Sequence, residues 1–241
     1  MRCLVFSDIH GNLDALEAVL TDAGHVDQIW SLGDVVGYGP QPNECIARLR
    51  ETTHIAVAGN HDWAAVGKLE TTAFNQDALR ACLWTRNVLS PSSSDYILAL
   101  PETVVEDDYT LAHGSPRYPI WEYITDTSVA AASLAHFATP YCLVGHTHVP
   151  RVFHCKDLGP CAQLDLPLGE VMRLGRERTF INPGGVGQPR DGDPRASYLL
   201  LDSAENTVEL RRVEYDVEHT QSLMRSARLP ERLIWRLAQG W

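Results

Sequence analysis

The chain has 241 residues, of which 44% are hydrophobic and 21% are charged, and its formal net charge is −11 at pH 7. This length suits one large core or two small domains, and the acidic balance argues against a protein that grips a nucleic-acid polymer through its own Lys and Arg. Small anionic substrates remain compatible with it, because bound metal ions can supply positive charge locally. Six cysteines without a Cys-x-x-Cys pair, no signal peptide and no apolar stretch of membrane-spanning length favour a reduced, cytoplasmic enzyme without a membrane partner.

The first sixty residues alternate between strand and helix patterns. Short apolar strands are expected over 2–6, 26–32 and 55–58. A helix with an apolar face follows Asn12, which is a suitable N-cap, and a second helix begins at Pro42. This βαβαβ order predicts a largely parallel sheet with helices packed on it.

The remainder of the chain has a different pattern. Residues 75–100 are expected to be helical with a break at Ser90-Pro91. Short strands are then expected over 103–106, 110–112, 141–144, 151–154, 179–181, 196–201 and 207–213. One helix around 128–137 lies among them, and the pattern returns to helix from Val217. No linker-like Pro/Gly/Ser run interrupts the chain, so we expect a single domain over 1–241.

Five short polar segments each follow an expected strand. They are Asp8-Ile9-His10, Gly33-Asp34, Gly59-Asn60-His61-Asp62, His113-Gly114 and Gly145-His146-Thr147-His148. In open α/β sheets the carboxyl ends of the strands deliver side chains to a common crevice. Carboxylate, amide and imidazole groups in this number can hold two adjacent divalent ions, an arrangement suited to phosphoryl chemistry.

Each segment also has a simpler interpretation. Gly33-Asp34 is ordinary turn chemistry, and Gly59-Asn60-His61-Asp62 could be a polar turn with a helix cap. Gly145-His146-Thr147-His148 is more specific, because two imidazoles at i and i+2 directly follow an apolar run. The joint occurrence of all five segments favours a metal centre. The five remaining histidines match no segment and are interpreted as structural: His25, His54, His136, His154 and His219.

In this order the motifs resemble those of the calcineurin-like metallophosphoesterase superfamily. Residues 113–116 and 182–191 also resemble its small bacterial and archaeal phosphodiesterase branch, which includes enzymes that act on diadenosine tetraphosphate. The resemblance implies an α/β fold, a four-layer α/β/β/α sandwich of two mixed β-sheets flanked by helices. It also implies that Asp34 bridges two ions and that the ligands are Asp8, His10, Asp34 and His148 for one ion and Asp34, Asn60, His113 and His146 for the other.

One position departs from the pattern of the superfamily's protein phosphatases. In those enzymes an Asp three residues after the bridging Asp orients the catalytic His, and here that position is Gly37. A phosphoprotein substrate is therefore less expected, and the partner of His61 is left open. A second alternative is a catalytically weak metal-binding scaffold. It predicts missing ligands or a lost His61, and the sequence shows neither.

The expected reaction is in-line attack on phosphorus by a metal-bridging hydroxide, with small phosphodiesters or nucleotide phosphoanhydrides as substrates. Asp34 and His61 are the expected catalytic residues. His61 follows Asn60 and is not required as a ligand, so it can stabilise the phosphate oxygens or protonate the leaving group. The alternative role for His61 is to orient a ligand. The two divalent ions could be Mn, Fe, Zn, Co or Ni, and the oligomeric state is open.

Asn60, His61 and Arg190 are the expected substrate-binding residues. Arg190 lies in a Gly-rich segment that can approach a phosphate closely, but it could equally pair with Asp191 or Asp193. Arg117 and Tyr38 are weaker candidates, and Trp63 could pack in the core or face the site. No insertion is long enough to form a lid, so we expect an open site.

Overall fold

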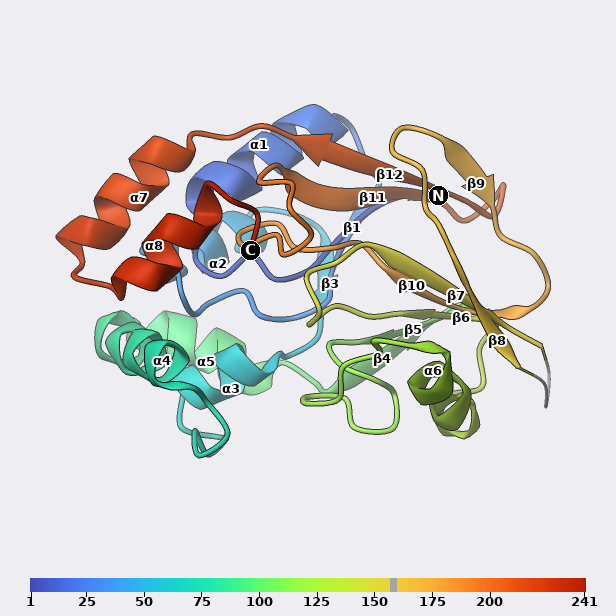
Figure 1. The fold of residues 1–241 in the computed structure, drawn as a ribbon, viewed down its shortest axis with the longest axis horizontal. Helices are drawn as coiled ribbons and strands as arrows, with labels where there is room; N and C mark the ends of the chain where they lie inside the picture. The colour runs from blue at the N-terminus through green and yellow to red at the C-terminus, as the bar shows by residue number, and fades with distance from the viewer. Residues whose placement is uncertain (157–159) are drawn as a thin grey trace.

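The computed structural model describes residues 1–156 and 160–241, where two mixed six-stranded sheets stack face to face between layers of helices (Figure 1). The first sheet has the order β3-β2-β1-β11-β12-β9, from His54–Ala56, Gln28–Ser31, Arg2–Phe6, Ala196–Asp202, Thr207–Val213 and Val171–Arg173. The second has the order β4-β5-β6-β10-β7-β8, from Thr103–Glu106, Tyr109–Ala112, Tyr141–Leu143, Arg178–Asn182, Arg151–Cys155 and Cys161–Leu164. The expected four-layer sandwich is confirmed.

Helices cover the outer faces of both sheets. The first sheet is covered by α1 (Leu13–Ala23) and α2 (Pro42–Arg50), and the second by α6 (Thr127–Ser133) with the 3-10 turn Leu134–His136. The remaining helices gather at one end of the sandwich (Figure 1): α3 (Asn60–Ala65), α4 (Gln76–Val88), α5 (Pro91–Ala99), α7 (Val217–Ser226) and α8 (Glu231–Leu237). In the part of the chain that the structure describes, no helix has the length and apolar character needed to cross a bilayer.

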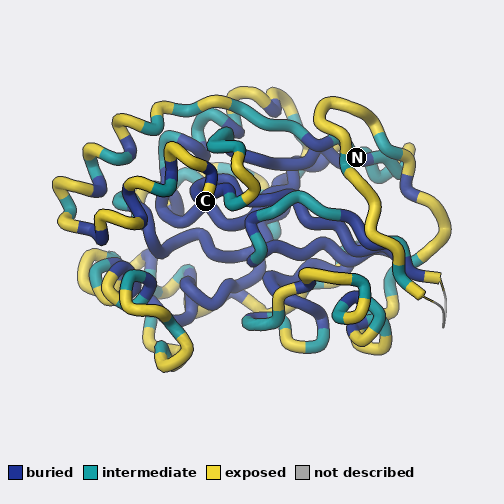
Figure 2. The backbone as a smooth tube through the Cα atoms, in the orientation of Figure 1, coloured by how far each residue is buried: buried dark blue, intermediate teal, exposed yellow. Residues whose placement is uncertain are grey.

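Alternation along β1 explains how one strand serves two cores. Leu4 and Phe6 point to the layer that contains α1 and α2, whereas Cys3 and Val5 point to the layer between the sheets. Successive side chains of a strand point to opposite faces, so a strand that is apolar throughout is buried on both. Figure 2 shows the resulting band of buried backbone through the middle of the molecule.

The strongest sequence patterns match the structure, and the weakest ones were missed. Asn12 caps α1 by accepting a hydrogen bond from the Ala15 backbone N–H at 3.1 Å, and Ser90 caps α5 after the expected break. Sequence analysis missed α3, β8 and β9. α3 has six residues and lies inside a ligand motif, while β8 and β9 are short and mostly exposed, so neither strand has a strong alternating pattern.

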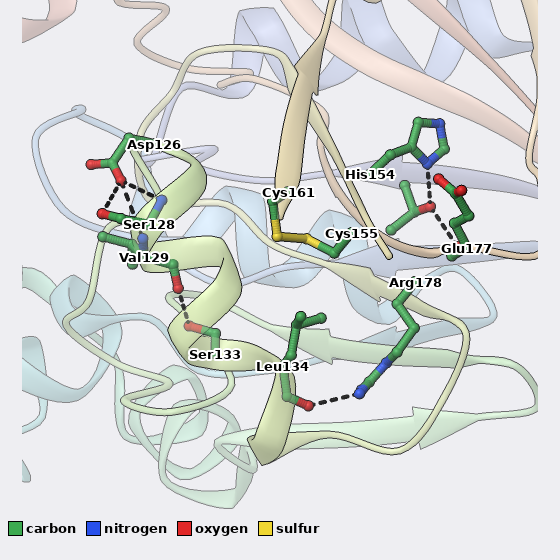
Figure 3. Close-up of a disulfide and its surroundings, with 11 residues drawn as sticks. Asp126, Ser128, Val129, Ser133, Leu134, His154, Cys155, Cys161, Glu177 and Arg178 are labelled. Carbon is green, nitrogen blue, oxygen red and sulfur yellow. Dashed lines mark hydrogen bonds between the residues drawn. A yellow bond between two sulfur atoms is a disulfide. The ribbon is translucent and has the colours of Figure 1, made fainter. Parts of the chain in front are cut away.

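The expectation that all six cysteines are reduced is wrong for two of them. Cys155 ends β7 and Cys161 begins β8, and the two form a disulfide beside α6 (Figure 3). The strand register places them directly opposite one another, with their Cα atoms 4.0 Å apart. Their spacing in the sequence gave no sign of this, because the pairing depends on the register of the hairpin. The other four cysteines are buried and free: Cys3, Cys45, Cys82 and Cys142.

Candidate metal centre

The polar segments predicted from the sequence meet where the two sheets present strand ends to the same space. Asp8 and His10 follow β1, Asp34 follows β2, and His113 follows β5. Backbone hydrogen bonds fix the loops to each other, because Asp8 N–H donates to the Gly33 carbonyl at 3.0 Å and His10 N–H donates to the Asp34 carbonyl at 2.9 Å. Every candidate ligand side chain is at most 4% exposed. The fold therefore gathers the segments into one buried cluster.

One group of potential ligands consists of Asp8, His10 and His148. The distance from His148 Nε2 to Asp8 Oδ1 is 3.1 Å, and the distance from His10 Nε2 to His148 Nε2 is 3.2 Å. His10 Nε2 lies 3.7 Å from Asp8 Oδ1. These atoms surround a space that a single ion with oxygen and nitrogen ligands would fill.

The second group consists of Asp34, His113 and His146, with Asn60 beside it. His113 Nε2 lies 3.0 Å from His146 Nδ1 and 3.4 Å from Asp34 Oδ2. The same Asp34 Oδ2 atom lies 3.7 Å from His10 Nε2 of the first group. Asp34 thus stands between the two groups, where a bridging ligand would have to be.

The tautomers of three imidazoles favour a bound cation. Nδ1 of His10, His113 and His148 faces a backbone carbonyl at 3.1, 2.8 and 2.6 Å, respectively. A carbonyl oxygen only accepts, so Nδ1 carries the hydrogen and Nε2 of a neutral ring presents a lone pair. All three Nε2 atoms point into the cluster, where lone pairs and carboxylate oxygens face one another. A divalent ion is the group that such a donor set fits, and the carbonyl contacts are the usual orienting bonds of metal-binding histidines.

The two carboxylates are arranged in the same way. Asp8 Oδ2 accepts from His146 N–H at 3.0 Å and Asp34 Oδ1 accepts from His61 N–H at 2.9 Å, which leaves Asp8 Oδ1 and Asp34 Oδ2 for the cluster. Asp8 Oδ1 is buried and has no hydrogen-bond partner within the described residues. Burial would raise the pKa of Asp34, but neighbouring imidazoles, above all His113, hold it below its ordinary value. The free oxygens are therefore anionic ligand atoms.

The charge that the cluster favours is positive. Burial alone would lower the pKa of His113, but the nearby Asp34 carboxylate raises it to about 9. Burial, in contrast, lowers the pKa of His10 and of His146 well below the ordinary value. Most of the imidazoles are therefore neutral ligands, and the space beside Asp34 stabilises a cation.

The backbone of the site is strained. Five of the seven candidate ligand residues have a positive φ, between 51° and 65°: Asp8, His10, Asp34, His146 and His148. This left-handed region is uncommon for residues other than Gly and costs about 1–2 kcal/mol per residue. Such conformations persist where the surrounding structure enforces them, and they cluster at functional sites. Here they turn consecutive side chains of each loop into one space.

Asp62 is a positioning residue that the sequence analysis left without a role. Its carboxylate accepts hydrogen bonds from the backbone N–H groups of Val36 and Gly59, both at 3.0 Å, and its side chain is fully buried. The Val36 carbonyl in turn accepts from His10 Nδ1. Asp62 therefore ties together three of the loops that carry ligands. The sequence contained a sign of this role, because Asp62 is the fourth residue of the Gly-Asn-His-Asp segment and that segment otherwise supplies site residues.

His61 packs directly on Gly37. Gly37 has a φ of +91°, and a Cβ atom added there would lie 2.6 Å from His61 Nδ1. His61 Nδ1 is buried without a hydrogen-bond partner within the described residues, and burial lowers the pKa of this ring to about 4. No side chain can stand at position 37 to orient His61 in this backbone. Instead, the ring is held by aromatic contacts with Tyr38 and Phe74, at centroid distances of 4.2 and 4.7 Å.

The site is less open than the sequence suggested. Tyr123 stacks on the His146 ring at a centroid distance of 3.8 Å and an interplanar angle of 9°, and Trp121 contacts Phe74. These residues come from the ordinary connections between α3 and α4 and between β5 and α6. Two aromatic side chains from these connections, Tyr123 and Phe74, therefore pack on imidazoles of the site, and Trp121 packs on Phe74. Sequence analysis missed all three, because isolated aromatic residues in loops have no distinctive pattern.

Arg190 lies at the cluster, in a loop that packs on the ligand segments. The Val186 and Gly187 N–H groups donate to the carbonyls of Ser7 and Asp8 at 3.0 and 2.9 Å. The Arg190 guanidinium carbon is 5.8 Å from the centre of the Tyr38 ring, and Nη2 donates to Gln188. Its Nε is buried without a partner in the described part of the chain.

The alternative pairing of Arg190 is not found, because Asp191 pairs with Arg212 and Asp193 with Arg195. Arg117, a weaker sequence candidate, pairs with Glu122 and is occupied by that contact. Trp63 is 7% exposed and packs in the core.

Comparison with known proteins agrees with this geometry. Residues 1–206 match the model of the calcineurin-like phosphoesterase superfamily domain. The chain belongs to the calcineurin-like phosphoesterase superfamily. An uncharacterized protein of Methanocaldococcus jannaschii is 37% identical over 243 residues, covering 98% of this chain and 97% of the relative.

Two solved structures extend the comparison. A metallophosphoesterase from Sphaerobacter thermophilus is 49% identical with a TM-score of 0.91, and the alignment covers 100% of this chain and 99% of the other. A hypothetical protein from Pyrococcus horikoshii shares the fold at 22% identity and a TM-score of 0.78, covering 100% of this chain and 98% of the other. The chain is therefore a metal-dependent phosphoesterase, as its motifs predicted.

Proposed function

We propose that this phosphoesterase holds two divalent ions and hydrolyses small phosphodiesters or nucleotide phosphoanhydrides. The observation that supports two ions best is the donor set: three Nε2 lone pairs and two free carboxylate oxygens converge in two groups that meet at Asp34. The proposed ligands are Asp8, His10, Asp34 and His148 for one ion and Asp34, Asn60, His113 and His146 for the other. When bound, the ions would supply an activated nucleophile at neutral pH and would neutralise charge on the phosphate.

The protein side chains position the substrate and stabilise its charge. His61 has a pKa lowered to about 4 by burial, so it is neutral at pH 7 and acts as a hydrogen-bond donor to the phosphate oxygens. Arg190 has a buried, unpartnered Nε beside the cluster and binds the same phosphate or the leaving group. A folded phosphoprotein is a poorer substrate for this site, because Tyr123 and Phe74 lie against the rings of His146 and His61, and Trp121 packs on Phe74.

The test compares bis-p-nitrophenyl phosphate with p-nitrophenyl phosphate, using Mn²⁺-loaded protein whose metal content is measured by mass spectrometry. The wild-type protein is expected to turn over the diester. Asp34→Asn is expected to lose metal and activity together. His61→Ala is expected to keep both ions and lose about 10²–10³ in kcat, the usual effect of removing one donor to a developing oxyanion.

The matched control is His25→Ala, because His25 is exposed and lies outside the cluster. It is expected to keep both metal content and turnover. Fully metallated wild-type protein that hydrolyses neither ester would contradict the proposed substrates and favour the scaffold alternative. A metal-free His61→Ala protein would instead contradict the role given to His61.

A further inference from the structure

Three arginines lie at Tyr38 or in the cavity beside it. Arg190 is in the loop beside the cluster, and Arg232 and Arg236 are on α8. Among the residues that the structure describes, none of the three forms an ion pair, although neighbouring arginines such as Arg195 and Arg211 do. Positive charges that line one cleft attract anions to it.

The two α8 arginines line a cavity of about 300 Å³. Its opposite wall is Tyr38 and the first turn of α4, and α8 lies next to α4 at one end of the molecule (Figure 1). Apolar contacts between α4, α7 and α8, including Ala81 and Ile234, hold this wall in place. Asp77 is the one acidic residue lining the cavity, and it pairs with neither arginine.

The charges in this region repel one another. Burial, and after it the charge of Arg190, lowers the pKa of Arg236 to about 10; Tyr38 opposes this effect, and Arg232 adds a smaller contribution that also lowers the pKa. The hydrogen bond found for the Arg236 side chain goes to the backbone oxygen of Trp241, so no Asp or Glu side chain offsets its charge in the described residues. An anion between the guanidinium groups would relieve this repulsion and accept charge-assisted hydrogen bonds.

Tyr38 connects the cavity with the metal centre. It forms part of the cavity wall, and its ring centroid lies 4.6 Å from that of His10 and 4.2 Å from that of His61. Arg190 lies at the same boundary, because its guanidinium carbon is 5.8 Å from the centre of the Tyr38 ring. An anionic molecule that has one phosphate at the metal centre can therefore continue past Tyr38 towards α8.

We propose that Arg232 and Arg236, with Tyr38, form a second anion site that binds a phosphate group of the substrate other than the one that reacts. The inference deepens the proposed function, on which it rests for the reacting phosphate. It narrows the substrate class to esters or anhydrides that carry at least two phosphates. The matched family domain ends at residue 206, so the two arginines of α8 lie outside it, whereas Tyr38 lies inside it.

Inorganic tripolyphosphate is the probe. It is titrated by calorimetry into the metal-loaded 241-residue protein, and again into the same protein after EDTA has removed the metal. The metal-free wild-type protein is expected to bind it, because the arginines remain when the ions are gone. Arg232→Gln is expected to weaken binding about tenfold in both states, and Arg232→Lys less. Arg232 is exposed, so the fold is expected to survive, which circular dichroism checks.

Arg225→Gln is the matched control. Arg225 is on the adjacent helix α7, is 53% exposed, and lies 3.9 Å from Glu231 outside the cavity. It is expected to bind tripolyphosphate like the wild type. Equal affinity of the wild type, Arg232→Gln and the double variant Arg232→Gln/Arg236→Gln would overturn the inference. Diester turnover by the wild-type protein distinguishes the proposed function from the second anion site. If the diester is not hydrolysed, the proposed function is contradicted, but the affinity for tripolyphosphate still tests the anion site.

Discussion

The contact between His61 and Gly37 allows a sharp test of how the site is built. In Gly37→Ala, the new Cβ would lie 2.6 Å from His61 Nδ1 and 2.9 Å from its Cβ and Cγ. Ordinary contacts begin at 3.4 Å, so the ring must move by about 0.8 Å. The neighbouring ring of Phe74 limits this movement, because its centroid is already 4.7 Å from that of His61.

Two effects lower the free energy of unfolding of Gly37→Ala. A residue other than Gly at a φ of +91° costs about 1–2 kcal/mol, and overpacking of a buried contact typically costs about 1–3 kcal/mol. The free energy of unfolding is therefore expected to fall by about 2–5 kcal/mol. Gly169→Ala is the matched control, because its φ is +74° and nothing lies within 4 Å of the added Cβ. Its free energy of unfolding, measured by urea denaturation, is expected to fall by only about 1–2 kcal/mol, the cost of a positive φ without overpacking.

The effect on catalysis follows from the displacement of His61. A shift of about 1 Å in a group that positions the substrate can cost about 10²-fold. We expect Gly37→Ala to lose about 10- to 100-fold in kcat for bis-p-nitrophenyl phosphate, with both metal ions retained. Wild-type turnover in a folded Gly37→Ala protein would refute the reasoning. It would mean either that His61 is not needed or that the loop relaxes around the new methyl group.

Four further predictions test other parts of the structure. Asp62→Asn should lower the free energy of unfolding by about 1–3 kcal/mol, measured by urea denaturation, because one of two buried N–H groups loses its acceptor. Thiol titration of the denatured, unreduced protein should count four free cysteines; six would contradict the Cys155–Cys161 pair. Cys155→Ser removes this disulfide and should lower the free energy of unfolding by at most about 2 kcal/mol. The effect is small because the two cysteines are only six residues apart, so the disulfide restricts a short loop of the unfolded chain. Tyr123→Ala should alter KM for aromatic diesters while metal content stays unchanged; a metal-depleted variant would show instead that the stacked ring holds His146 in place.

The candidate ligands were predictable from the sequence because each follows the end of an apolar strand. Neighbouring strands such as β1 and β2 run parallel and end at the same edge, so local patterns already imply that Asp8 and Asp34 meet. The layered architecture followed from the same alternation of strands and helices, and the N-cap at Asn12 was visible in local chemistry. The cytoplasmic location stays a prediction, and the disulfide removes the argument from reduced cysteines on which it partly rested.

Other features were decided only by the tertiary structure. The Cys155–Cys161 pair depends on strand register, and the contact of His61 with Gly37 depends on how two loops meet. The aromatic cover of the centre and the arginines of α8 come from segments far apart in the chain, and none has a spacing that links it to the ligands. Local sequence determines which face of an element is apolar and where a strand ends. Contacts between loops depend instead on how whole elements pack, and short-range patterns carry no information about that.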